Sequence, residues 1–123
     1  MTTQIYMISL YTQDLHTLLH FYAEVIGLHL APHQEGPPHL EVGDSYLIIQ
    51  RGTPAQPADS GHLPALALVV EDLDQAIERL EENHVALLNG IEEHEDARWV
   101  KFHDPAGNQV ELIELYRTLI FGP

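Results

Sequence analysis

The strongest candidate for a functional residue is Glu111. It lies in the stretch Gln109–Leu115, where polar and apolar residues alternate, after the turn sequence Asp104–Asn108. Because side chains alternate across a strand, Val110 and Leu112 fall on the face opposite Glu111. We expect the two apolar side chains to pack on a helix and Glu111 to face a ligand cavity. A carboxylate in apolar surroundings takes up a proton or finds a cation or a hydrogen-bond donor. Glu111 is therefore predicted either to anchor a cationic or donor-rich ligand, or to be satisfied by a neighbouring Tyr, Arg or water.

A second group of candidates lies in the predicted strand Trp99–Phe102. Alternation puts Trp99 and Lys101 on one face of this segment, and Arg98 and Phe102 on the other. Trp99 and Phe102 could stack on a flat ligand, and Arg98 could pair with an anion. Packing in the core and at its rim is the alternative interpretation for all of them.

The nine histidines raise the question of a metal site. His16 and His20 have a helical spacing that can bind a metal, but they lie opposite the apolar helix face and are predicted to be solvated. His103 is the histidine most able to approach the cavity, so an atypical histidine-based metal site stays open. We interpret the acidic run Glu92–Asp96 as a solvated loop. The sequence shows no nucleophile elbow and no glycine-rich phosphate loop after a strand.

The elements that must position these residues come from an internal repeat. The stretches Met7–Leu30 and Ala65–Leu88 share one apolar pattern with an offset of 58 residues, the spacing of Asp14 and Asp72. Each copy opens with a short apolar run typical of a strand, followed by one of these two aspartates and then helical spacing. Both aspartates are predicted to cap their helices, and Gly27 is predicted to end the first helix in a left-handed conformation.

Three further short strands are predicted in each copy, so that each copy has the order β-α-β-β-β. They lie near Leu28–Ala31, His39–Val42 and Tyr46–Gln50 in the first copy, and near Ala86–Leu88, Trp99–Phe102 and Gln109–Leu115 in the second. The predicted organisation is a single domain with module one at about 4–50, a linker at 51–64, module two at about 65–115 and a C-terminal tail at 116–123. Modules of this size do not easily bury a helix face and a sheet alone, so they must pair within one chain or between two chains.

Composition limits the classes of partner. The chain has 123 residues, with 5 Lys plus Arg against 19 Asp plus Glu, for a net charge of −14. This charge argues against nucleic acid and anionic membrane surfaces, and it favours solubility or the attraction of metal ions and cationic small molecules. The chain has no cysteine, which excludes thiolate metal sites and cysteine nucleophiles. The sequence begins with no recognisable targeting signal and holds no apolar stretch long enough for a membrane span, so we expect a cytoplasmic protein.

Two motifs resemble those of the vicinal oxygen chelate superfamily, also called the glyoxalase/bleomycin resistance protein/dioxygenase family. The first is the opening Asp14-Leu15 with Phe21-Tyr22 and Ile26-Gly27-Leu28, echoed by Glu71-Asp72-Leu73, and the second is the close Asp104–Leu112, which reads DPAGNQVEL. The resemblance covers about residues 5–115. It implies an α+β fold in which two βαβββ modules form a cup-shaped incomplete barrel around a ligand site, usually in a homodimer.

The resemblance also implies where a divalent metal would bind in the enzymes of this family. Those positions hold Met7, Ile48, Ala65 and Glu111 in this chain. A catalytic cation needs three or four nitrogen or oxygen ligands, whereas this set offers one carboxylate. We therefore expect no cofactor and no metal at the family position.

These inferences predict metal-free binding or sequestration of a small cationic or aromatic molecule, as in bleomycin resistance proteins. The alternative is a metal-dependent lyase, isomerase or dioxygenase of the same superfamily with atypical ligands, so enzymatic activity stays open. No catalytic residue is assigned. The predicted ligand-binding residues, which line the cup unless they pack as plain core, are Glu111, Ser9, Tyr11, Tyr46, Ile48, Gln50, Met7, Ala65, Ala67, Trp99 and Phe102.

Overall fold

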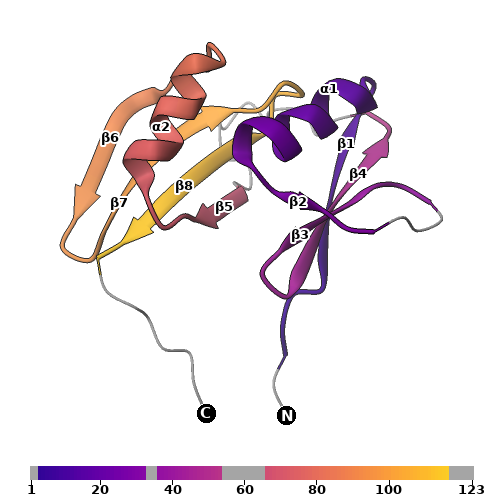
Figure 1. Cartoon of the computed structure of the whole chain (residues 1–123), viewed down its shortest axis with the longest axis horizontal. Helices are drawn as coiled ribbons and strands as arrows, with labels where there is room; N and C mark the ends of the chain where they lie inside the picture. Colours follow the sequence, from indigo (N-terminus) through magenta and orange to yellow (C-terminus); the bar gives the residue numbers. More distant parts are fainter. Residues whose placement is uncertain (1–2, 33–35, 54–65, 117–123) are drawn as a thin grey trace. The chain divides into compact units, whose positions relative to one another are not determined.

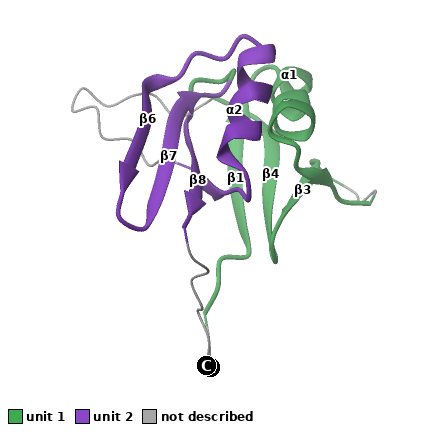
Figure 2. Ribbon diagram, turned by 60° about the vertical axis from the view of Figure 1, so that its left-hand side comes forward, with its two compact units in different colours: residues 1–56, 105–107 green, residues 57–104, 108–123 purple. Residues whose placement is uncertain are grey.

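The computed structural model describes residues 3–32, 36–53 and 66–116. Residues 54–64 of the predicted linker, Ala65, and residues 117–123 of the predicted tail lie outside the described residues. The chain divides into two compact units, of which unit 1 holds the elements of the first copy of the repeat and unit 2 those of the second (Figure 2). Within the described ranges, no helix has both the length and the apolar character needed to cross a membrane.

Unit 1 has the predicted order β-α-β-β-β (Figure 1). Its elements are β1 (Met7–Thr12), α1 (Leu15–His20), a π-helical continuation η1 (Phe21–Ile26), β2 (His29–Leu30), β3 (His39–Val42) and β4 (Ser45–Arg51). The sheet order is β1-β4-β3-β2, with β1 parallel to β4 and the other pairs antiparallel. The Asp14 carboxylate accepts the backbone N–H of Thr17 at 3.1 Å, and Gly27 ends the helix with a φ of 91°. Both predicted helix ends are confirmed.

Unit 2 repeats this arrangement. Its elements are β5 (Leu66–Val69), α2 (Leu73–Glu82), β6 (Leu88–His94), β7 (Ala97–His103) and β8 (Gln109–Leu115), and the sheet order is β5-β8-β7-β6. Strand β5 is parallel to β8, and the other pairs are antiparallel. The Asp72 carboxylate caps α2 by accepting the backbone N–H of Gln75 at 3.1 Å. The predicted pair of βαβββ modules is therefore confirmed.

Strand β6 differs from the prediction. Of the predicted segment Ala86–Leu88, only Leu88 belongs to this strand, which begins there and runs to His94, so the interpretation of the whole run Glu92–Asp96 as a loop is wrong. The difference from the prediction results from a bulge. Leu88 pairs with Lys101 and Glu92 pairs with Trp99, so β6 has two more residues than β7 between these two pairs. Asn89 and Gly90 take up this bulge with φ values of 64° and 69°. Only Glu95 and Asp96 remain as the turn that follows.

The helix of each unit covers one face of its sheet. The buried apolar residues on that side are Leu18, Phe21, Tyr22, Val25, Leu40, Leu47 and Ile49 in unit 1, and Leu68, Leu73, Leu80, Val100, Phe102, Val110 and Leu112 in unit 2. Val110 and Leu112 are 0 % and 2 % exposed, and α2 packs against β8. Their predicted packing on a helix is confirmed, and Glu111 therefore projects from the other face of the sheet.

An ion-pair network fixes the start of α2 to the strands beneath it. The Glu114 carboxylate accepts the backbone N–H of Leu73 at 2.9 Å and the Arg98 Nε–H at 2.9 Å. Arg98 also pairs with Asp74 through Nη1, at 3.1 Å. Arg98, a sequence candidate for binding an anion, is therefore engaged within unit 2.

This network predicts a loss of stability in acid. Hydrogen bonds from Arg98 and from the Leu73 backbone hold the pKa of Glu114 below its ordinary value of 4.5. A carboxyl group with a lower pKa in the folded state stabilises the protein above its unfolded pKa, and this contribution is lost as the pH falls through the folded value. Urea unfolding at a series of pH values below about 4.5 is expected to show this loss, and Glu114→Gln is expected to reduce it.

The matched control is Glu78→Gln, at an exposed position of α2. It removes the same charge and should leave the acid dependence as in the wild type. An acid dependence equally steep in Glu114→Gln and in the wild type would contradict the assignment.

Candidate functional site

The candidate site in unit 2 is the face of its sheet opposite α2, which we call the helix-free face of unit 2. Strand register places two rows of side chains across this face. One row holds Ala67, Glu111, Lys101 and Leu88, and the next holds Val69, Ile113, Trp99 and Glu92. Val69 is 66 % exposed, so part of this apolar surface is open to solvent. This face therefore presents the charged side chains of Glu111, Lys101 and Glu92 next to the apolar and aromatic side chains of Val69, Ile113 and Trp99.

Four of these residues, Glu92, Trp99, Lys101 and Glu111, form what we call the Lys101 cluster. The Trp99 indole N–H donates to the Glu92 carboxylate at 2.6 Å. The Lys101 ammonium lies 3.5 Å from the Glu92 carboxylate and 4.0 Å from the Glu111 carboxylate. The side chains of Lys101, Glu92 and Glu111 remain 29 %, 33 % and 22 % exposed. The cluster joins an aromatic ring to two carboxylates that share one cation.

The charged partner of Glu111 is thus Lys101, on the neighbouring strand. The sequence placed Lys101 on the same face as Trp99 but did not suggest this pairing, and it did not suggest Glu92 as a member of the site. The sequence feature that could have revealed Glu92 is the Asn89-Gly90 dipeptide, because this pair is typical of left-handed backbone and of bulges. A bulge there moves Glu92 into register with Trp99.

The helix-free face of unit 1 brings together the six residues predicted from the first copy of the repeat. Met7, Ser9 and Tyr11 on β1 pair in register with Tyr46, Ile48 and Gln50 on β4. The Gln50 Nε2–H donates to the Ser9 Oγ at 3.2 Å. Tyr46 makes edge contacts with the rings of Tyr6 and His39, at centroid distances of 5.8 and 5.6 Å. The helix-free face of unit 1 therefore carries an aromatic group and one hydrogen-bonded pair of an amide and a hydroxyl.

The predicted ligand-binding residues of unit 1 differ in how far their side chains are exposed to solvent. Met7 and Tyr11 are 41 % and 43 % exposed, whereas Ile48 is only 3 % exposed. Ile48 therefore offers little surface to a ligand in this structure.

Phe102 lies elsewhere. It is 0 % exposed and sits in the core of unit 2, on the side of β7 that α2 covers. The structure therefore gives Phe102 a packing role, the alternative that the sequence had left open. His16 and His20 are exposed on α1, in agreement with their predicted solvation.

The residues at the family's metal positions do not fit a divalent ion. Ile48 offers no donor atom, Met7 offers a thioether that suits soft ions, and Ala65 lies outside the described residues. The Glu111 carboxylate already has a cation beside it, Lys101. Nowhere among the residues that the structure describes do three or more His, Asp or Glu side chains come together in a way that could hold a metal.

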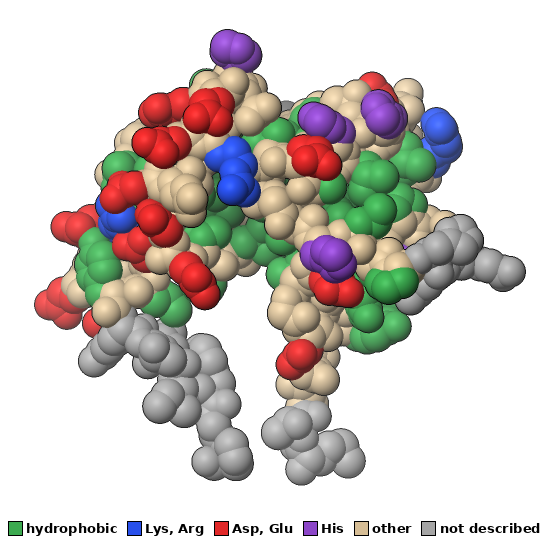
Figure 3. Space-filling model, in the orientation of Figure 1, with side chains coloured by type: hydrophobic (Ala, Val, Ile, Leu, Met, Phe, Trp, Pro, Cys, Tyr) green, Lys and Arg blue, Asp and Glu red, His purple; other side chains and the backbone are tan. Residues whose placement is uncertain are grey.

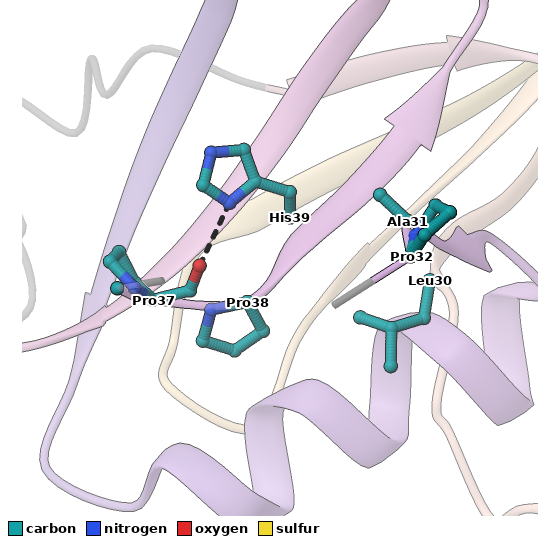
Figure 4. Close-up of a pocket in the computed structure, with 7 residues that line it drawn as sticks. Leu30, Ala31, Pro32, Pro37, Pro38 and His39 are labelled. Atoms are coloured by element: carbon teal, nitrogen blue, oxygen red, sulfur yellow. Dashed lines mark hydrogen bonds between the residues drawn. The ribbon is translucent and has the colours of Figure 1, made fainter. Parts of the chain in front are cut away.

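A separate cavity of about 280 Å³ lies in unit 1, beside the ends of β2 and β3 (Figure 4). Its lining is mostly proline and aliphatic: Leu30, Ala31, Pro32, Gly36, Pro37, Pro38 and His39. His39 supplies its one polar side chain, with Nδ1 2.8 Å from the Pro37 carbonyl oxygen. This volume lies at the lower limit of ordinary ligand pockets, roughly 300–1,000 Å³, and the lining holds no carboxylate. We therefore place the candidate site on the helix-free face of unit 2 and not in this cavity.

Comparison with known proteins agrees with the fold. The family model described as Glyoxalase/Bleomycin resistance protein/Dioxygenase superfamily matches residues 4–112. A lactoylglutathione lyase from Agrobacterium tumefaciens has a similar structure, with a TM-score of 0.69 and 23 % identity over 92 % of this chain and 94 % of the lyase. An antibiotic binding protein from Streptomyces sp. CB03234 has a TM-score of 0.72 and 23 % identity over 93 % of this chain and 97 % of its own. At these identities the likenesses show the fold. A search of the curated proteins found no match.

Proposed function

Since the chain belongs to the glyoxalase/bleomycin resistance protein/dioxygenase superfamily, we propose that it binds or sequesters a small aromatic cation without using a metal. The observation that carries this proposal is the Lys101 cluster. Trp99 offers a flat ring next to Ile113, while Glu92 and Glu111 offer carboxylates to a positive group. Aromatic rings and carboxylates together are what an aromatic cation requires.

The charge of the chain supports the same ligand class. Acidic side chains crowd the visible surface around α2, with few basic side chains among them (Figure 3). A net charge of −14 attracts cations towards the protein and raises their local concentration. Anionic ligands are disfavoured by the same field.

One protein of similar structure supports small-molecule binding as a role for this fold. The Streptomyces protein of similar structure is named an antibiotic binding protein. We propose that Ala67, which is paired with Glu111, also contacts this ligand. For the unit 1 residues Met7, Ser9, Tyr11, Tyr46, Ile48 and Gln50, ligand contact stays a prediction. The cytoplasmic location and the homodimer implied by the resemblance stay predictions.

The test uses the fluorescence of Trp99, the only tryptophan in the chain. The three probes share one ring system and differ in charge: biphenylmethylamine, biphenylmethanol and biphenylcarboxylate. The amine is expected to change the Trp99 emission in a saturable way and to bind more tightly than the alcohol or the carboxylate. It should also raise the melting temperature, since a ligand at 100 times its Kd adds about 2.7 kcal/mol.

Two outcomes would overturn the proposal. If none of the three probes changes the emission or the melting temperature, the helix-free face of unit 2 does not bind aromatic molecules of this size. If the carboxylate binds most tightly, the preference for a cation is wrong.

A further inference from the structure

We infer that Lys101 determines the charge specificity of the candidate site, because its ammonium occupies the place between Glu92 and Glu111 that the positive group of a ligand would take. The inference rests on the proposed function and adds that Lys101 competes with the ligand for the two carboxylates. In this view Lys101 is a built-in cation that a ligand must displace. A cationic ligand gains the two carboxylates only when the lysine moves away.

The sheet order places Lys101 at the centre of the charged group. Strand β7, which carries Lys101, lies between β8, which carries Glu111, and β6, which carries Glu92. The ammonium therefore has one carboxylate on each side, at 4.0 Å and 3.5 Å. This is the arrangement that a bound ammonium group of a ligand would also adopt between the two carboxylates.

The Glu92 carboxylate is held more firmly than the ammonium. The bulge at Asn89 and Gly90 brings Glu92 opposite Trp99. The indole N–H then fixes the Glu92 carboxylate with a hydrogen bond of 2.6 Å. The acidic side of the pair is thus positioned by the backbone and by Trp99, independently of Lys101.

The ammonium itself is held loosely. Both of its distances to oxygen exceed the range of about 2.7–3.2 Å for a direct N–H···O hydrogen bond. The side chain is 29 % exposed and carries its charge on a flexible four-carbon stem. Ion pairs of this kind contribute little to stability, so the lysine can leave at small cost. A fixed carboxylate beside a movable ammonium is what displacement by a ligand requires.

The experiment compares the wild type with Lys101→Met. Biphenylmethylamine is expected to bind the variant about two- to thirtyfold more tightly, the range that corresponds to losing two partly exposed ion pairs as competitors. Biphenylmethanol, which has no charge, should bind both proteins equally. The readout is the fluorescence of Trp99, which lies on the same face of the same strand as Lys101.

The matched control is Arg79→Gln, at an exposed position of α2. It removes one positive charge and should leave the affinity for the amine close to that of the wild type. Acetylation of folded wild-type protein gives a second measurement, since Lys101 is its only lysine. It should reproduce the tighter binding without any substitution that could disturb folding, and Lys101→Arg should restore the wild-type affinity.

The outcomes separate this inference from the proposed function. If the amine binds the wild type but binds Lys101→Met and the acetylated protein no more tightly, the inference is wrong and the proposed function stands. If the amine binds only when the lysine charge is removed, the inference holds and the wild type does not bind cations as proposed. If Arg79→Gln gives the same gain as Lys101→Met, net charge explains the effect and the inference is wrong. If no probe binds any variant, both are wrong.

Discussion

Replacing Phe102 by alanine is expected to lower the free energy of unfolding by about 3–5 kcal/mol. The ring is 0 % exposed beneath α2, with Val100 and Val110 among the buried residues on the same side of the sheet. Truncating a large buried ring loses its transfer free energy and leaves a cavity that the surrounding side chains fill only in part. Urea unfolding followed by circular dichroism measures the loss.

The milder variant Phe102→Leu distinguishes a packing role from a ligand-binding one. It keeps an apolar side chain and should be less destabilising than the alanine variant. Its affinity for biphenylmethylamine should match that of the wild type, because Phe102 and Trp99 lie on opposite faces of β7. A stable, folded Phe102→Leu protein with much weaker binding would contradict the placement of Phe102 in the core.

Most of the fold could be predicted because it depends on local chemistry. Asp14 and Asp72 cap their helices through side-chain oxygens, and these contacts involve only residues three positions away. Gly27 has the positive φ that few other residues tolerate. The repeat then fixed the element order, since the same apolar spacing produces the same module twice.

The candidate site was less predictable because it depends on register between strands. Alternation alone places Trp99 and Lys101 on one face of their own strand, but it does not say that they lie on the same side of the sheet as Glu111 or which residues are neighbours. That information resides in the two extra residues of β6, which bring Glu92 beside Trp99. A bulge changes the pairing of every residue beyond it. A prediction that misses the bulge therefore also misses the contact of Glu92 with Trp99.

The cluster also explains how a carboxylate is retained where the family resemblance implies a metal ligand. Glu111 needs a cation or a donor because it is only 22 % exposed at its side chain. Lys101 supplies a positive charge from within the same sheet, so the carboxylate has a partner without a bound ion. Under the proposed function, such a site attracts a cationic ligand while lacking the further ligands that a divalent ion requires.

The contribution of Glu111 to ligand binding is expected to be large. Glu111→Gln should weaken the binding of biphenylmethylamine about ten- to hundredfold, because a hydrogen bond to a charged group contributes about 1.5–3 kcal/mol and each 1.4 kcal/mol is a tenfold change in affinity. Glutamine keeps the shape and the hydrogen-bonding ability of the side chain, so the loss reports the charge. Titration of Trp99 fluorescence measures it, and biphenylmethanol should bind the variant as it binds the wild type.

Glu95→Gln is the matched control for this prediction. Glu95 is exposed in the turn between β6 and β7, and its replacement changes the net charge by the same amount. It should have only a small effect on the affinity for the amine, and added salt should remove that effect because exposed charges at a distance are screened. An equal loss in Glu95→Gln and Glu111→Gln would mean that the general field of the protein attracts the amine and that Glu111 makes no direct contact. A loss confined to Glu111→Gln that persists in salt would locate the ammonium of the ligand at this carboxylate.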